Sequence, residues 1–233
     1  MKAHSFIYLI IYSCFIMSVS LQAQEHFADR YNVSYITMDD GLPHNFIDDI
    51  YKDTRGFLWI STAGGGLSRY DGYEFIHFNP NTPHSKLKSN FIHNVYEDRF
   101  HRLWIVSEGG TDIIDLSTLQ SVIPNDPKGL LPRFINHPTY IVILDSQGCI
   151  WLQCDNALHR ITFDAEGGID TLSTLDLPEQ DEPDLILKDI DEDGKIWTGI
   201  NGTIYKITPT PQGQLEKSSI SEQLTFWPGI YFK

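Results

Sequence analysis

Short apolar segments that alternate with turn residues recur along the chain. Residues 46–51 are apolar around two aspartates, and after an Asp-x-x-Gly turn an apolar segment follows at 58–62. A glycine-rich turn at 64–66 leads to a third segment at 67–70, and Asp71-Gly72 leads to a fourth at 73–78. In such turns Asp accepts backbone hydrogen bonds and Gly supplies a positive φ. The pattern predicts three to four short antiparallel strands joined by hairpins, without long helices.

This unit repeats with a period close to 46 residues. Every copy carries an Asp six residues before a Trp, in the pairs Asp53 and Trp59, Asp98 and Trp104, Asp145 and Trp151, and Asp191 and Trp197. The intervals between successive Trp residues of this set are 45, 47 and 46 residues. A small sheet cannot bury its faces alone, so one large aromatic per unit at a regular period is what packing of neighbouring sheets requires. We therefore interpret the Trp residues as core residues and the Asp residues as turn formers.

Three to four strands in roughly 45 residues are typical of one blade of a β-propeller. The sequence predicts an all-β propeller within residues 24–233, with blades at approximately 46–78, 91–124, 139–177 and 185–221. Residues 226–233 resemble the strand that precedes each turn, so we expect the chain to stop in the first strand of a fifth blade. We also expect a strand around Tyr35 to Met38, which would normally close a propeller ring by joining the last blade, a blade that we expect to be missing here.

The first 23 residues have the three parts of a secretory signal peptide. Lys2 supplies the positive charge, residues 6–19 form an almost uncharged apolar run, and Ala23 lies at a plausible cleavage point. The alternative is an uncleaved membrane anchor, but the run is shorter than the about 20 apolar residues that a span requires. We therefore expect the protein to be exported.

Two cysteines, Cys149 and Cys154, would lie in an oxidising compartment after export and suggest a disulfide. They flank Trp151 in a segment that is expected to be a strand, where five residues at about 3.3 Å each span roughly 16 Å. A disulfide requires Cα atoms closer than about 7 Å. We therefore interpret both cysteines as buried thiols.

The composition indicates a globular protein and argues against one class of partner, but it does not identify a function. The chain has 233 residues, 41% of them hydrophobic and 12% aromatic, which is typical of a globular protein. Its 17 basic against 31 acidic residues give a net charge of −14. A duplex-binding protein needs a basic face to neutralise phosphates, so this balance argues against nucleic acid as a partner.

Motifs for metals, phosphates and catalysis all fail on a required residue. Residues 189–194 resemble the start of a calcium loop, but the twelfth position is Ile200 instead of Glu. The glycine-rich stretch at 63–68 lacks the Gly-Lys-Ser/Thr ending of a phosphate loop. The nine histidines show no ligand spacing, and neither a carboxylate pair nor a nucleophile elbow is evident. The sequence therefore predicts no catalytic residue, no metal and no cofactor.

Three segments of the first unit resemble the two-component regulator propeller repeat: Gly41-Leu-Pro-His-Asn-Phe-Ile, Asp53-Thr-Arg-Gly-Phe-Leu-Trp-Ile-Ser-Thr and Gly66-Leu-Ser-Arg-Tyr-Asp-Gly-Tyr-Glu-Phe. The second unit departs from this repeat at His101, where Gly is usual, and the third and fourth lack the Arg-Tyr-Asp-Gly ending. The resemblance extends over about residues 33–233. This repeat forms the periplasmic sensor region of hybrid two-component systems in Bacteroidetes.

The resemblance implies a larger receptor with two seven-bladed propellers, an immunoglobulin-like domain, a membrane helix and a cytoplasmic histidine kinase. Such receptors dimerise, respond to oligosaccharides, and control transcription of polysaccharide-utilisation genes. We therefore expect an incomplete seven-bladed propeller, a periplasmic sensor fragment with an oligosaccharide ligand and with no enzymatic activity of its own. Two alternatives stay open: a self-contained four-bladed secreted scaffold that binds carbohydrate or protein, and a propeller glycosidase or lyase.

In a propeller, the loops between blades and the turns between second and third strands share one face. If a sugar binds on this face, the candidate ligand-binding residues are His44, Asn45, Arg69, Tyr70 and Asn90. The alternative is that these side chains only order the loops, as Asn commonly does in turns.

Overall fold

The computed structural model describes residues 34–83, 85–154, 156–177, 189–191, 194–200, 203–210 and 212–219. The expected signal peptide and the expected start of a fifth blade at 226–233 lie outside these residues. The chain divides into two compact units, Met1–Ile36 and Thr37–Lys233, and all described strands belong to the second. Within the described residues, no helix has the length and hydrophobicity to cross a bilayer.

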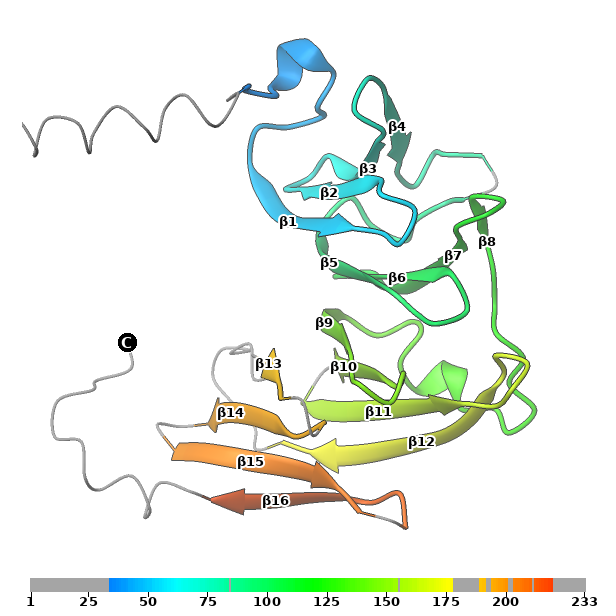
Figure 1. Ribbon diagram of the computed structural model, residues 1–233, viewed down its shortest axis with the longest axis vertical. Coiled ribbons are helices and arrows are strands. Elements are labelled where there is room, and N and C mark those ends of the chain that lie inside the picture. Colours follow the sequence, from blue (N-terminus) through cyan, green and yellow to red (C-terminus); the bar gives the residue numbers. More distant parts are fainter. Residues whose placement is uncertain are drawn as a thin grey trace, which may run out of the picture. The chain divides into compact units, whose positions relative to one another are not determined.

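Four antiparallel sheets of four strands each follow one another along the chain (Figure 1). The first sheet contains β1 (Ile47–Lys52), β2 (Leu58–Thr62), β3 (Gly66–Tyr70) and β4 (Phe75–Phe78). The second contains β5 (Ile92–Glu97), β6 (Arg102–Ser107), β7 (Gly110–Asp115) and β8 (Gln120–Ser121). The third contains β9 (Thr139–Leu144), β10 (Ile150–Cys154), β11 (Ala157–Phe163) and β12 (Ile169–Asp176). The fourth contains β13 (Asp189–Ile190), β14 (Ile196–Ile200), β15 (Thr203–Pro209) and β16 (Leu215–Ser219).

Each sheet is a meander in which every strand pairs with the next, and its first strand lies at one edge. The prediction of an all-β fold with one small antiparallel sheet per repeat is confirmed. The two described helices are single 3-10 turns, η2 (Met38–Asp40) and η3 (Leu131–Arg133). Successive sheets contact each other through their first strands, which we call the inner strands. β1 contacts β5, and β5 contacts β9.

The strand expected around Tyr35 to Met38 is not formed, and this prediction is wrong. Residues 34–37 pair with none of the described strands, and Met38 begins η2. The side chain of Asp40 accepts hydrogen bonds from the Thr37 backbone N–H (2.8 Å) and Oγ1 (3.1 Å), and Gly41 ends the turn at φ 104°. A strand needs a neighbouring strand for its backbone groups, and at Thr37 a local bond to Asp40 satisfies the backbone N–H instead.

The turn between the first two strands of each sheet is organised by the repeated Asp. In the first sheet, Asp53 Oδ1 accepts the backbone N–H of Arg55 (3.0 Å) and of Phe57 (2.9 Å). Its Oδ2 accepts the indole N–H of Trp59 at 2.9 Å. The same indole bond recurs from Trp104 to Asp98 (2.8 Å), from Trp151 to Asp145 (2.9 Å) and from Trp197 to Asp191 (2.9 Å). The offset of six residues therefore corresponds to a direct hydrogen bond within each repeat.

The second repeat makes this turn without glycine. Three residues after the Asp, the other repeats have Gly56, Gly148 and Gly194 at φ between 75° and 95°. His101 takes this place with φ 57°. A left-handed conformation costs a non-glycine residue roughly 1 kcal/mol. The His101 Nδ1 lies 2.9 Å from Glu97 Oε1, a contact that offsets part of this cost.

The core consists of layers between successive sheets. Trp59 packs with residues of the second sheet such as Val95 and Leu103, and Trp104 packs with residues of the third such as Val142. Trp151 lies in the layer with Ile196 of the fourth sheet. Each of these Trp side chains thus helps to join its own sheet to the next one.

Cys149 and Cys154 are both buried and form no disulfide, which confirms the sequence interpretation. Burial raises the pKa of the Cys149 thiol to about 11, and the nearby Asp145 carboxylate adds to the shift. Cys149 is therefore protonated at neutral pH.

Candidate functional site

Strand direction separates two ends of each sheet. The segment that enters β1 and the turn between β2 and β3 lie at one end, which we call the loop end. The turns at 53–57 and 71–74 lie at the other, which we call the turn end. Neighbouring sheets meet at the loop end, where the Gly66 N–H donates to the Asn90 carbonyl at 3.0 Å.

The five predicted ligand residues do not come together. His44, Asn45 and Asn90 lie at the loop end. Arg69 and Tyr70 are the last residues of β3 and lie at the turn end, where the Arg69 guanidinium is 4.3 Å from the Phe57 ring centre. The structure therefore does not bring the five residues together at one end of the sheet.

Most of these side chains hold the local backbone. His44 Nδ1 accepts the Phe46 N–H at 3.0 Å, and Asn45 Oδ1 accepts the Met38 N–H at 3.0 Å. The Tyr70 hydroxyl donates to the Gly72 carbonyl at 2.8 Å. Asn90 differs, because its Oδ1 is buried and has no hydrogen-bond partner among the described residues. These contacts match the loop-ordering alternative for three of the five.

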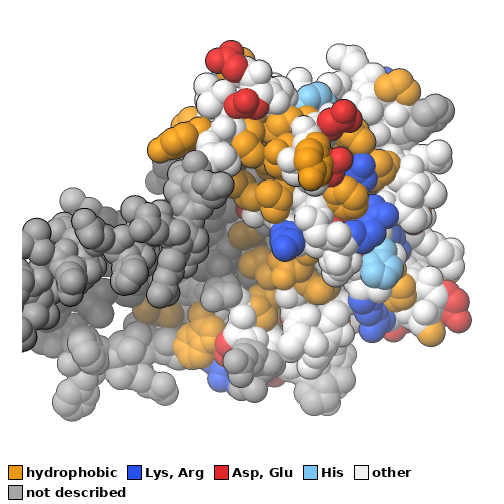
Figure 2. Space-filling model, turned by 45° about the horizontal axis from the view of Figure 1, so that its top comes forward, with side chains coloured by type: hydrophobic (Ala, Val, Ile, Leu, Met, Phe, Trp, Pro, Cys, Tyr) orange, Lys and Arg blue, Asp and Glu red, His pale blue; other side chains and the backbone are white. Residues whose placement is uncertain are grey.

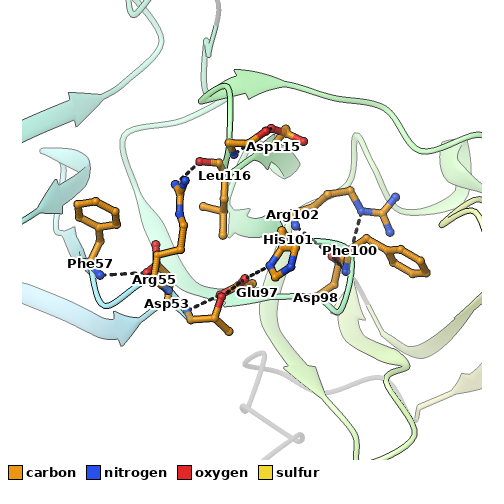
Figure 3. Close-up of polar contacts among 12 residues, drawn as sticks. Asp53, Arg55, Phe57, Glu97, Asp98, Phe100, His101, Arg102, Asp115 and Leu116 are labelled. Carbon is orange, nitrogen blue, oxygen red and sulfur yellow. Dashed lines mark hydrogen bonds and ion pairs between the residues drawn. The ribbon is translucent and has the colours of Figure 1, made fainter.

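The turn end is tied together by contacts between sheets (Figure 3). The backbone N–H and the hydroxyl of Thr54 each donate to the Glu97 carboxylate at 2.7 Å, and the Arg55 guanidinium donates to the Leu116 carbonyl. Arg102 bonds Asp98 Oδ2 through Nε at 2.7 Å. The polar groups drawn in this view are largely engaged with one another, so this end serves to join sheets.

An open hollow of about 520 Å³ lies along the inner strands of the first three sheets. The side chains that line it come from the first halves of β1, β5 and β9: Asp48, Asp49, His93, Asn94, Tyr140 and Ile141. They occupy only two positions of the repeat. One position is five residues before the turn Asp (48, 93 and 140), and the other is four residues before it (49, 94 and 141).

Side chains at the second of these positions tie each inner strand to the next. Asp49 Oδ2 accepts the Val95 N–H at 3.2 Å. The Asn94 amide bonds both backbone groups of Val142, accepting from its N–H and donating to its carbonyl at 2.9 Å each. Burial raises the pKa of Asp49 above 3.8, against the lowering effect of the backbone N–H bonds.

Side chains at the first position have polar groups that make no hydrogen bond within the described residues. His93 Nε2 is buried without a hydrogen-bond partner, and the His93 ring lies 5.6 Å from the ring of Tyr140, tilted by 37°. Within the described residues, neither the Asp48 carboxylate nor the Tyr140 hydroxyl makes a hydrogen bond. Burial lowers the pKa of His93 below 6.5, although Glu108 and Asp48 act in the opposite direction, so the imidazole is neutral at pH 7.

The sequence reasoning missed this row of side chains. A signal was present, since Asp48, His93 and Tyr140 share one repeat position while the position two residues later is apolar in all three repeats. Comparing the repeats position by position would have found it.

The sequence matches the family model of the two component regulator propeller at residues 41–64 and 86–109. Each match runs from the loop that enters a sheet to the turn after its second strand, in the first and the second sheet. A search of curated protein sequences gives no match.

Two similar solved structures are extracellular domains from B. thetaiotaomicron, both described as parts of hybrid two component systems. For BT4673 the TM-score is 0.53, with 24% identity over 78% of this chain and 25% of that chain. For BT3049 the TM-score is 0.51, with 19% identity over 80% of this chain and 32% of that chain. Virginiamycin B lyase from Staphylococcus aureus reaches a TM-score of 0.50, with 17% identity over 76% of this chain and 56% of that chain.

The fold is thus a β-propeller built from four-stranded sheets. The two matched segments are similar to the two-component regulator propeller repeat, which the sequence also resembles. It spans about a quarter of the length of the BT4673 domain.

Proposed function

We propose that the chain is a ligand-sensing propeller module of a periplasmic hybrid two-component receptor. In this proposal it responds to an oligosaccharide, serves the regulation of polysaccharide utilisation, and has no catalytic activity of its own. The observation that carries the proposal is the presence of two-component regulator propeller repeats in the first two sheets.

The fold and the N-terminal sequence support this role. The similar BT4673 and BT3049 domains are extracellular and belong to systems described as hybrid two component systems. The predicted signal peptide at residues 1–23 is consistent with export. Membrane anchoring, dimerisation and the kinase output are proposed for the larger receptor, because the chain spans only part of the length of these relatives.

The hollow supplies a place for a ligand. Binding sites combine an apolar or aromatic surface with a few convergent polar groups. The His93 and Tyr140 rings provide the aromatic surface, while Asp48 and the two rings provide polar atoms without partners among the described residues.

The test is a binding survey with the purified chain. Oligosaccharides of neutral, amino and acidic classes are screened by thermal shift, and hits are titrated calorimetrically. We expect saturable binding of one class, with the oligosaccharide recovered unchanged by mass spectrometry. Lack of binding by every class would contradict oligosaccharide sensing, and recovery of cleaved product would favour the lyase or glycosidase alternative.

A further inference from the structure

The internal repeat separates the residues that build the hollow from those that only pack. Three residues before the turn Asp, the three repeats have Ile50, Val95 and Val142, all apolar. Two residues earlier they have a carboxylate, an imidazole and a phenol, from Asp48, His93 and Tyr140. Packing between sheets buries Val95 and Val142 at this place in the repeat, whereas no packing requirement explains three different polar groups two residues earlier.

The neighbouring residues hold this row in place. Asp49 bonds the backbone of β5, and Asn94 bonds the backbone of β9 on both its N–H and its carbonyl. These bonds fix the three inner strands beside one another just next to Asp48, His93 and Tyr140. Because the strands that carry this row are already fixed, a ligand would bind with little free-energy cost for ordering them.

The charge of the hollow selects among ligands. Asp48 and Asp49 line it, and Glu108 lies close enough to act on the titration of His93. No Lys or Arg is among the described lining residues, and the His93 imidazole is neutral at pH 7. An acidic sugar would bring its charge next to these carboxylates, which costs free energy, whereas a cation is attracted by them and by the Tyr140 ring face.

We propose that the hollow binds an amino sugar, with the protonated amine of the ligand held by the Asp48 carboxylate. The sugar ring lies against the His93 and Tyr140 rings, and the Tyr140 hydroxyl bonds one of its hydroxyl groups. Asp49 is not the anchor, because its Oδ2 already accepts the Val95 N–H. The inference rests on the proposed oligosaccharide-sensing function and adds the chemical class of the ligand.

The experiment titrates the full chain with three disaccharides, of glucosamine with free amines, of N-acetylglucosamine, and of galacturonic acid. We expect saturable binding of the glucosamine disaccharide alone. Asp48→Asn is expected to weaken it about tenfold or more, the effect of losing a charge-assisted hydrogen bond. Asp48 is exposed, so this variant is expected to fold. Glu216→Gln on β16, which removes one exposed carboxylate far along the chain from the hollow, is the matched control and should bind normally.

A second variant tests the contribution of the Tyr140 hydroxyl. Tyr140→Phe retains the ring and removes the hydroxyl, so it should weaken binding of the glucosamine disaccharide less than Asp48→Asn does. Binding of the N-acetylated or acidic disaccharide as tightly as the amine, or amine binding that ignores Asp48→Asn, would overturn the inference and leave oligosaccharide sensing intact. Failure of all oligosaccharide classes in the wider survey counts against both proposals.

Discussion

The middle sheets and the first sheet carry the same repeat in different surroundings. Val95 of the second sheet is 1% exposed and Val142 of the third is 0% exposed, but Ile50 at the same repeat position of the first sheet is 57% exposed. The second and third sheets pack on a described sheet at both faces, and the first packs on such a sheet at one face only. Figure 2, in which the end of the unit with the first sheet comes forward, shows hydrophobic side chains at the surface there.

The Trp series gives the same contrast at the other end of the repeats. Trp59, Trp104 and Trp151 are fully buried, whereas Trp197 is 38% exposed. All four indoles nevertheless bond their own Asp at 2.8 to 2.9 Å. The hydrogen bond is thus a property of one repeat, and burial is a property of two neighbouring repeats, as in other repeat architectures.

Removal of a Trp is expected to give the largest difference in stability between a sheet packed on both faces and a sheet packed on one. Trp104→Ala leaves a cavity between two sheets and should lower the free energy of unfolding by about 3–5 kcal/mol. Trp197→Ala should cost about 1–2 kcal/mol, since that side chain is already partly in water. Urea unfolding of both variants measures the difference, and equal losses would show that the next sheet contributes nothing to Trp burial.

The turn Asp residues differ in whether their carboxylate also neutralises a buried arginine. Arg160 is buried and its Nε lies 3.2 Å from Asp145 Oδ2, while no salt bridge to Asp53 is found within the described residues. Asp145→Asn leaves this guanidinium unneutralised and should cost about 3 kcal/mol, against about 1–2 kcal/mol for Asp53→Asn. The comparison again uses urea unfolding, and a larger loss for Asp53→Asn would contradict the assignment of the buried pair.

Shortening the apolar residue three positions before the turn Asp gives a smaller contrast. Val95→Ala removes two buried methyl groups and should cost about 2 kcal/mol. Ile50→Ala removes more atoms, but mostly exposed ones, and should cost less than about 1 kcal/mol. Thermal unfolding midpoints rank the two variants, and the reverse order would mean that Ile50 is covered in solution.

The smallest effect concerns pH and His93. Because burial lowers the folded-state pKa of His93 below 6.5, the unfolded chain binds more protons than the folded one once the pH falls below that value. This contribution to stability is therefore full above pH 6.5 and is lost as the pH drops through it. The charges of Glu108 and Asp48 face the ring and limit the loss.

Unfolding free energies measured from about pH 8 to about pH 5 test this dependence. The dependence of the unfolding free energy on pH should be weaker in His93→Gln than in the original protein. Asp49 acts with the opposite sign, because its raised pKa makes the folded state bind the proton more tightly above 3.8, so its effect belongs to the acid end. An unchanged slope in His93→Gln would contradict the buried neutral imidazole.

Much of the fold was predictable because its signals are periodic. The Asp-to-Trp offset of six residues located every first hairpin, even in the second repeat, where His101 replaces the turn glycine. The indole bond was not foreseen, since an offset does not show which atoms meet. The strand expected at Tyr35 to Met38 failed because pairing depends on a partner strand, and local sequence carries no information on one.

The candidate site was predictable only in part. His44, Asn45 and Asn90 share the loop end, because each lies in a loop that enters a sheet. Arg69 and Tyr70 were grouped with them because they belong to the same repeat motif, but β3 carries them to the turn end. Asp48, His93 and Tyr140 were missed because they are inconspicuous singly and become a group only when the inner strands lie side by side.

Hydrogen exchange of the indole N–H groups tests most directly the claim that each Trp is bonded within its repeat and buried by the next. The four resonances are assigned with single Trp→Phe variants and followed by heteronuclear NMR in deuterated buffer. We expect slow exchange for Trp59, Trp104 and Trp151, and the fastest exchange of the four for Trp197. Exchange of Trp197 as slow as the others, or exchange of any buried indole as fast as that of a free one, would contradict it.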